Sequence, residues 1–469
     1  MKKVLFLISF LFSFFAFSET DSSDSTRFFE KQLQNGMTLI YYKIPNSEIS
    51  SIYLGFKAGS RYDEFGYEGE SQLLEMMAFK GTVRIGSKNF DEESKLSKDL
   101  ENIGDQITLL QAEGKSGKDV DDLIKKALLL KSKIEPLQAP LAFAKWFYDL
   151  GAKNRYAKSS KDFFEIGSSF PKESLEAVMA IEGEWLVQPA FRNFYEERAI
   201  LYDYQSKVAK ENVNDKYQIL YSDSFGRKMT RGLPNANKIT MQKFREYFKK
   251  ALNPKFGVIV ICGDYLFEYV DNLAETFFGK IVSDQEKPLF MDEIKNDKKV
   301  FSYLIEDELL LTIKKDDIEP EREAMLDLFT SNLFQSDSPI FSETFKKQVL
   351  RGMIINGDPG LCPPNLFLLR FQLKENSVGE EARKNLRNSL EKNVFSKLSS
   401  QDFEKIKRNI LKNVYSNSEK IDDLARSIGE GFLISGDPQY FIDYTTSLEK
   451  MTQQDANRIA NSFFACLKE

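Results

Sequence analysis

The chain has 469 residues, of which 42% are hydrophobic and 29% are charged, and its net charge is −6. This composition supplies enough apolar material for the cores of two or three domains, and the mildly acidic mixture of charges excludes nucleic-acid binding through a basic surface. The absence of histidine excludes Ser-His-Asp and Cys-His catalysis and any histidine-ligated metal within this chain. Three widely spaced cysteines, Cys262, Cys362 and Cys466, exclude a cysteine-based zinc site, and a single disulfide is left open.

Residues 1–18 have the pattern of a signal peptide. Lys2 and Lys3 precede an apolar run from Val4 to Phe17 that is too short to span a bilayer comfortably, and Ser18 fits a small-residue cleavage site. An uncleaved membrane anchor is the alternative. We therefore expect an exported protein, periplasmic in a two-membrane bacterium and extracellular otherwise, with no membrane span after cleavage.

The first elements of the mature chain are readable from turns and periodicity. Asn35-Gly36 between two apolar runs predicts a β-hairpin, and residues 50–60 predict a further strand. A short apolar helical stretch follows at residues 69–82 and ends in a Lys-Gly-Thr turn. From about residue 91 to 144, apolar residues recur every three or four positions among many charges, which predicts two helices broken near residues 113–119. This hairpin is either a solvated surface element or an arm that grips a partner.

The rest of the chain alternates strands and helices. A helix is expected between Pro171 and Pro189, with Pro171 in its first turn, and another follows from about residue 192. Residues 253–265 predict a buried strand, and a charged stretch at 281–300 is the best candidate for a domain boundary. Strands and helices resume from residue 301. The mixture predicts an α+β architecture used twice.

Several motifs taken together resemble the pitrilysin/insulinase family of zinc peptidases, in the two-domain form of the mitochondrial processing peptidases. The resemblance is strong from Phe28 to Tyr265 and weaker from Phe301 to the end. The motifs occur in the family order, and they are LQNGMTLIYY at residues 33–42, GFKAGSRYDEFGYEGESQLLEMMAFKGT at 55–82, FRNFYEERAIL at 191–201 and NPKFGVIVICGDY at 253–265.

The resemblance implies two homologous domains, each an antiparallel-rich sheet with helices packed on one face, as in the LuxS/processing-peptidase-like metallohydrolase fold. The N-terminal domain would span residues 19–280, with the hairpin at 91–144 inserted in it. A linker at 281–300 would lead to a C-terminal domain at 301–469. A working chamber in this family needs four such domains, which implies that two chains associate.

The family motif H-x-x-E-H places two zinc-binding histidines on one helical face, with the glutamate as general base on the zinc-bound water. In this chain the first histidine position is Gln72, the base is kept as Glu75, and the second histidine position is Met76. An amide is a poor zinc ligand and a thioether is a soft one. The resemblance therefore implies no zinc and no other cofactor, and Glu75 becomes a vestigial base.

The third zinc ligand of the family lies seven positions after the glutamate of a Glu-Arg pair on a later helix. That pair is Glu197-Arg198, so Glu197 keeps the acid that supports the metal ligands. The ligand position is Tyr204, or Asp203 if the alignment slips by one residue. We expect Tyr204 to hydrogen-bond Glu75 or Gln72 and to fill the space of the metal.

Two further family features bind the substrate. A Gly-Gly-x-x-Asn-Ala strand edge pairs with the peptide backbone, and Gly151 and Asn154 keep part of it, with Arg155 where alanine is usual. An arginine and a tyrosine of the second domain contact substrate in active members. Their positions here are Phe345 and Gly352, on a looser alignment.

Three functions are consistent with these replacements. The first is a catalytically inactive, exported pseudo-enzyme that serves as the partner or substrate-binding subunit of an active homologous peptidase. The second is a stand-alone peptide-binding or scaffold homodimer. The third is an active metalloendopeptidase with a non-standard site. All three predict peptide or unfolded polypeptide as the bound molecule.

Overall fold

A computed structural model describes residues 27–211, 234–282, 300–305, 308–315, 318–333, 349–355, 365–373, 384, 388, 390 and 394–468. The predicted signal peptide, residues 283–299 of the predicted linker, Phe345 and Cys362 lie outside this part of the chain. Within the described part, no helix has the length and apolar character needed to cross a membrane. Cys262 and Cys466 are both buried.

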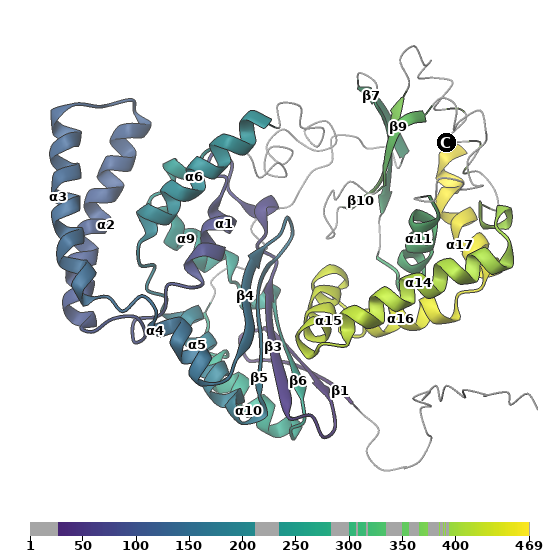
Figure 1. Ribbon diagram of the computed structural model, residues 1–469, viewed down its shortest axis with the longest axis horizontal. Helices are drawn as coiled ribbons and strands as arrows, with labels where there is room; N and C mark the ends of the chain where they lie inside the picture. Colours follow the sequence, from purple (N-terminus) through teal and green to yellow (C-terminus); the bar gives the residue numbers. More distant parts are fainter. Residues whose placement is uncertain are drawn as a thin grey trace, which may run out of the picture.

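The first half of the chain builds a six-stranded sheet (Figure 1). Its order is β1-β2-β6-β3-β5-β4; β2 and β6 are parallel and the other neighbours are antiparallel. The predicted hairpin joins β1 to β2, and Gly36 has a φ of +88°, which suits the tight turn. The strands are β1 Phe28–Gln32, β2 Thr38–Lys43, β3 Ile49–Phe56, β4 Lys153–Ser159, β5 Phe164–Pro171 and β6 Gly257–Gly263.

One face of this sheet packs against helices from the same half of the chain. Ile52, Leu54 and Phe56 alternate along β3 and point into this core, as the two-residue period of a strand requires. Pro171 ends β5 instead of opening the predicted helix, which begins only at Leu175. The helices are α1 Glu70–Met77, α4 Ala142–Asp149, α5 Leu175–Val187, α6 Phe194–Glu211, α9 Met241–Ala251 and α10 Phe267–Phe277.

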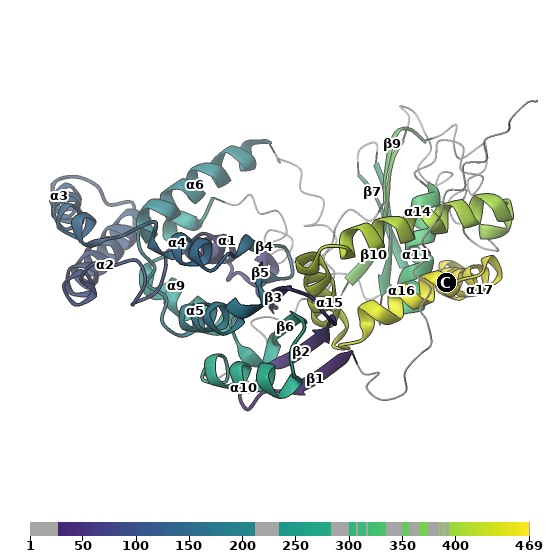
Figure 2. The same cartoon turned by 60° about the horizontal axis from the view of Figure 1, so that its bottom comes forward.

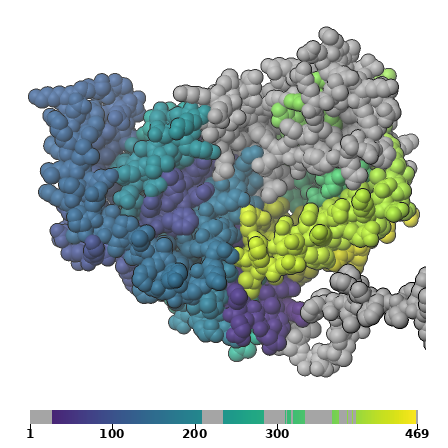
Figure 3. All heavy atoms as spheres, viewed as in Figure 1, coloured from purple at the N-terminus to yellow at the C-terminus, as the bar shows by residue number. Residues whose placement is uncertain are grey.

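The opposite face of the same sheet is covered by α15, Ile421–Ser435, from near the end of the chain. Ala425, Ile428 and Leu433 of α15 share a buried core with strand residues that include Tyr53 and Val260. Figures 1 and 2 place α15 against β3 and β6, and Figure 3 shows the yellow-green C-terminal helices directly on the first half. The helices of the first half thus cover one face of this sheet, and α15, which comes from the second half, buries the other face.

Two long helices form the predicted hairpin. α2, Phe90–Ala112, and α3, Lys118–Ile134, pack on each other, and the break between them falls where the glycine-containing segment predicts it. The hairpin lies at the far end of the molecule from the C-terminal helices in both Figure 1 and Figure 2. Tyr195 of α6 donates to Asp105 of α2 at 2.8 Å, so the hairpin is anchored to the core through its first helix.

A second, four-stranded antiparallel sheet has the order β7-β8-β10-β9. Gly352 lies on β9, opposite Gln372 of β10. Leu309, Leu369 and Phe371 pack with the surrounding helices in a separate core. The strands are β7 Val300–Ile305, β8 Glu308–Lys315, β9 Val349–Ile355 and β10 Asn365–Leu373, and the helices are α11 Pro320–Leu333, α14 Ser400–Ser418, α16 Tyr440–Lys450 and α17 Gln453–Phe464.

Candidate functional site

The helix α1 carries three of the residues expected at the degenerate site. Its first turn is fixed by the Asp63 carboxylate, which accepts hydrogen bonds from the Gly69 amide at 2.8 Å and the Ser71 amide at 2.9 Å. This arrangement satisfies amides that have no partner within the helix. The buried face of α1 consists of Leu73, Leu74 and Met77, whereas Gln72, Glu75 and Met76 are half-buried.

The carboxylate of Glu75 is engaged with the backbone of a neighbouring strand. Its Oε2 accepts a hydrogen bond from the Ser159 amide at 2.8 Å, at the end of β4. Met76, next to it on α1, packs against the apolar core of the first half. The group that occupies the position of a general base thus links α1 to the edge of the sheet.

The helix α6 carries Tyr204, the residue at the expected third ligand position. Tyr204 is 53% exposed, and the carboxylate of Glu75 is bonded to Ser159, so the expectation that Tyr204 fills the space of a metal is wrong. Asp203 is exposed as well. Glu197, the expected supporting acid, forms an ion pair with Lys80 just after α1.

These side chains do not fit a zinc ion. Zinc in proteins takes thiolate, imidazole and carboxylate ligands, and an amide with a thioether is a poor substitute. Across the residues that the structure describes, no three histidine, cysteine or acidic side chains cluster closely enough to hold a metal. No hydrolytic step through a zinc-bound water follows from Gln72, Met76 and Tyr204.

The strand β4 forms the open edge of the first sheet, since its neighbour in the described structure is β5 alone. The Ser159 amide points away from β5 toward Glu75, and backbone groups alternate in direction along a strand. The polar backbone groups of Ala157 therefore point outward too. Gly151 has a φ of +72° at the start of this edge, and Asn154, with a φ of +54°, lies where the β4–β5 register shifts.

A buried ion pair behind this edge escaped the sequence-based prediction of roles. Arg155 of β4 donates to Glu182 of α5 through Nε at 2.9 Å and Nη2 at 3.0 Å. The Arg155 guanidinium also lies over the rings of Phe143 and Phe147, at 4.9 and 4.5 Å from their centroids. One signal was available: Glu182 is a charged residue inside an apolar helix, where burial requires a partner.

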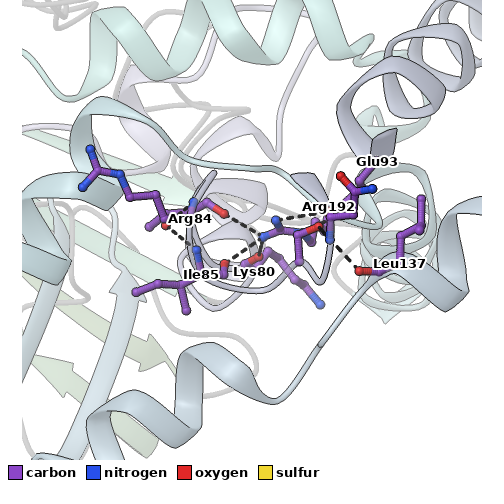
Figure 4. Close-up of polar contacts among 9 residues, drawn as sticks. Lys80, Arg84, Ile85, Glu93, Leu137 and Arg192 are labelled. Carbon is purple, nitrogen blue, oxygen red and sulfur yellow. Dashed lines mark hydrogen bonds and ion pairs between the residues drawn. The ribbon is translucent and has the colours of Figure 1, made fainter. Parts of the chain in front are cut away.

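The loop that leaves α1 is held by a second buried arginine (Figure 4). Arg192 Nη1 lies 3.0 Å from each of the carbonyl oxygens of Lys80, Thr82 and Ile85, and its Nε donates to Glu93 at 2.8 Å. One guanidinium thereby satisfies three loop carbonyls and the start of α2. The position of α1 against β4 is fixed from both ends, by Asp63 at its start and by Arg192 after its end.

Two family models match the chain. Residues 38–108 match the insulinase family, peptidase family M16, and residues 238–410 match the inactive domain of peptidase M16. Uncharacterised zinc proteases from Rickettsia bellii and Rickettsia felis are each 44% identical over 62 residues. That stretch is 13% of this chain and only 15% of each relative's length.

The fold is shared with solved M16-type structures at low sequence identity. A protease from Helicobacter pylori has a TM-score of 0.62 at 17% identity, and the match covers 93% of this chain and 96% of that one. An M16 inactive domain from Pseudomonas fluorescens has a TM-score of 0.60 at 14% identity, covering 93% and 95%. The periplasmic protease PqqL from Escherichia coli has a TM-score of 0.57 at 14% identity, and the match covers 93% of this chain but 46% of PqqL.

Proposed function

We propose, since the chain belongs to the insulinase family (peptidase family M16), that it is an exported, non-hydrolysing subunit that binds peptide for an active homologous peptidase. The proposal rests on two features of the α1 site, the replaced ligand positions and the hydrogen bond made by Glu75. Gln72 and Met76 stand at ligand positions, and the carboxylate of Glu75 is committed to the Ser159 amide. A residue held in this way stabilises the edge of a sheet and has no metal-bound water to deprotonate.

Peptide binding is assigned to the edge of β4. An extended peptide adds to an open strand through main-chain hydrogen bonds, so it requires no metal and no particular side chain at the site. We assign this pairing to the outward backbone groups of Ala157, and the Arg155–Glu182 pair holds the strand from behind. Glu75 closes the far end of the edge at Ser159.

The need for a partner rests on chain length and on the family. The structural match with PqqL covers 93% of this chain but only 46% of PqqL. One copy of this chain therefore corresponds to about half of the larger protein. A second chain would provide the rest of a chamber. An active homologue carrying H-x-x-E-H would also provide the zinc chemistry that this chain lacks, whereas a second copy of this chain would give a binding homodimer.

Export is proposed from the N-terminal sequence. The basic start, the short apolar run and Ser18 form the pattern of a cleaved signal peptide. PqqL, one of the structural relatives, is described as periplasmic. Mass spectrometry of the protein from a periplasmic extract would identify the mature N-terminus, and an intact Met1 would contradict the proposal.

The deciding experiment joins metal analysis to two variants of Glu75. The mature protein, Glu75→Gln and Glu75→Leu are incubated with zinc, and bound metal and cleavage of quenched fluorescent peptides are measured on each sample. We expect no stoichiometric zinc, no cleavage by any of them, and equal binding of a labelled extended peptide by wild type and Glu75→Gln. One zinc per chain, with cleavage abolished in Glu75→Gln, would show an active peptidase and overturn the proposal.

A second experiment separates the partner from the homodimer. The chain is co-expressed with a homologue from the same organism that carries an intact H-x-x-E-H motif. Joint elution, with faster peptide cleavage than the homologue achieves alone, is the expected result. A stable dimer of this chain by itself, with no effect on the homologue, would favour the scaffold function.

A further inference from the structure

A cluster of charged groups lies between β5 and α15, far from α1 in the sequence. Glu165 of β5 is only 1% exposed and faces α15. Arg426 of α15 lies with Nε 3.3 Å from Glu165 Oε2 and Nη2 2.8 Å from Glu430 Oε1. Tyr53 of β3 donates to Glu165 Oε1 at 3.4 Å. One guanidinium is therefore shared by two carboxylates in the contact between the two halves of the chain.

When both carboxylates are ionised, only one positive charge lies close to Glu165, the Arg426 guanidinium with Nε at 3.3 Å. Arg426 contributes one positive charge, and Lys158 of β4, which is exposed, contributes a second at the margin. Two tyrosines complete the surroundings and are neutral in this range. The titratable groups that interact with Glu165 from the packed elements are Tyr53 of β3, Tyr156 and Lys158 of β4, and Arg426 and Glu430 of α15. Asp422 of α15 interacts with Tyr156.

Burial, and next the charge of Glu430, raises the pKa of Glu165 to about 8. An unfolded chain gives a glutamate a pKa of about 4.3, so the docked state binds a proton that the undocked state releases. The stability supplied by that proton is complete below the unfolded value. It is lost as the pH rises from there through 8, because the docked state must then ionise a buried carboxyl beside Glu430.

The helix that carries Arg426 is also attached to the edge strand. Asn154 Nδ2 of β4 donates to Asp422 of α15 at 3.2 Å, and Arg426 lies over the Tyr156 ring at 5.9 Å. Ser51 Oγ of β3 donates to the carbonyl oxygen of Ile421 at 2.8 Å. A shift of α15 would therefore reach β4, the strand with the open edge.

We propose that α15 is a pH-sensitive clamp on the first sheet, docked while the buried Glu165 is protonated beside Arg426 and Glu430, and loosened when Glu165 is ionised. The clamp joins the two halves of the chain at neutral and mildly acidic pH. Alkaline conditions add an uncompensated negative charge to a buried contact and favour release of the helix. This inference does not depend on the peptide-binding function.

The test is hydrogen–deuterium exchange of the full mature chain at pH 7 and pH 9, with rates divided by the intrinsic chemical rate at each pH. A group that titrates at about 8 lowers the docked-to-undocked ratio about tenfold across this range. We expect this loss of protection in α15 and β5 of the wild type. Glu165→Gln, a neutral mimic of the protonated side chain, should keep its protection at both pH values.

Two further variants complete the test. Glu404→Gln removes an exposed acid on α14 and should reproduce the tenfold loss of the wild type. Glu430→Gln removes the neighbouring charge that raises the pKa of Glu165, so the loss of protection between pH 7 and pH 9 should be smaller than in the wild type. Equal protection of wild-type α15 at pH 7 and 9 would overturn the proposal. A full tenfold loss in Glu165→Gln, or in Glu430→Gln, would overturn it as well.

Discussion

Two groups of buried and partly buried charges flank the edge of the first sheet, and they are built differently. In the corner between α1 and β4, Glu75 meets one backbone amide, Arg155 meets Glu182, and Lys80 meets Glu197. At the contact between β5 and α15, the single guanidinium of Arg426 meets two carboxylates. In the first group each charged residue has a partner of its own, whereas in the second one cation is divided between two acids.

Charged residues of the same type therefore have different roles in the two groups. A buried pair with its hydrogen bonds satisfied fixes geometry, because breaking it leaves an uncompensated charge in the interior. A carboxylate with too few counter-charges titrates near neutral pH instead and makes its contact responsive. The corner at α1 is thus a rigid support for the β4 edge, whereas the α15 contact is adjustable.

The largest expected effect comes from breaking the balanced pair. Arg155→Ala leaves Glu182, which is 0% exposed, without its counter-charge, and we expect a loss of about 3–5 kcal/mol in the free energy of unfolding. Urea denaturation measures it. Lys145→Ala, which removes an exposed pair with Asp149, is the matched control and should cost about 0.5 kcal/mol or less.

Replacing both charges of this pair sharpens the comparison. Arg155→Met combined with Glu182→Leu removes the charges and keeps the volume, so most of the lost stability should return. A double variant as unstable as Arg155→Ala would show that packing of the arginine on Phe143 and Phe147, rather than charge balance, dominates this corner.

A smaller effect is expected from crowding the α15 contact. A Cβ built on Gly429 would lie 2.2 Å from Tyr53 Cε1, too close for any side chain without movement of the ring or the helix. Gly429→Ala should therefore cost about 1–3 kcal/mol in the urea-induced unfolding of the chain. Adding Tyr53→Val makes room, and a double variant less stable than the sum of the two single changes would argue against a direct clash.

The smallest effect is expected at Glu75. Glu75→Leu removes the acceptor of the Ser159 amide, and we expect a loss of about 1 kcal/mol, the net contribution of one hydrogen bond. Glu75→Gln keeps an acceptor oxygen and should match the wild type in urea denaturation. Faster hydrogen exchange at the Ser159 amide in the leucine variant alone would assign the lost stability to this hydrogen bond. Identical exchange in all three proteins would show that Glu75 does not bond the Ser159 amide.

Local elements of the fold were predictable because local sequence encodes them. The turn at Gly36, the break between α2 and α3, and the buried strand β6 follow from glycine placement and apolar periodicity. Pro171 was misleading, since the fixed φ of proline also suits the end of an extended strand. The cover of the second sheet face by α15 could not be predicted, because the periodicity of an amphipathic helix does not say which sheet it meets.

The candidate site also has features that the sequence predicts and features that only the fold reveals. Replacement of the metal-binding residues at Gln72 and Met76 is readable from the motif itself. The contact of Glu75 with Ser159 joins residues 84 positions apart and depends on where α1 sits. Arg155 differs from the alanine of the family pattern, but the sequence alone does not show that it pairs with Glu182. The structure shows this pair directly.

The late position of α15 in the chain also shapes how the protein is made. Strand β6 is complete at Gly263, but the helix that covers Ile40, Val258 and Val260 begins only at Ile421. Until then the nascent first half carries an uncovered apolar face beside an unpaired edge strand, a combination that recruits other chains into aggregates. A product truncated before α15 is therefore a target for chaperones and proteases, and only the finished chain protects its own first half.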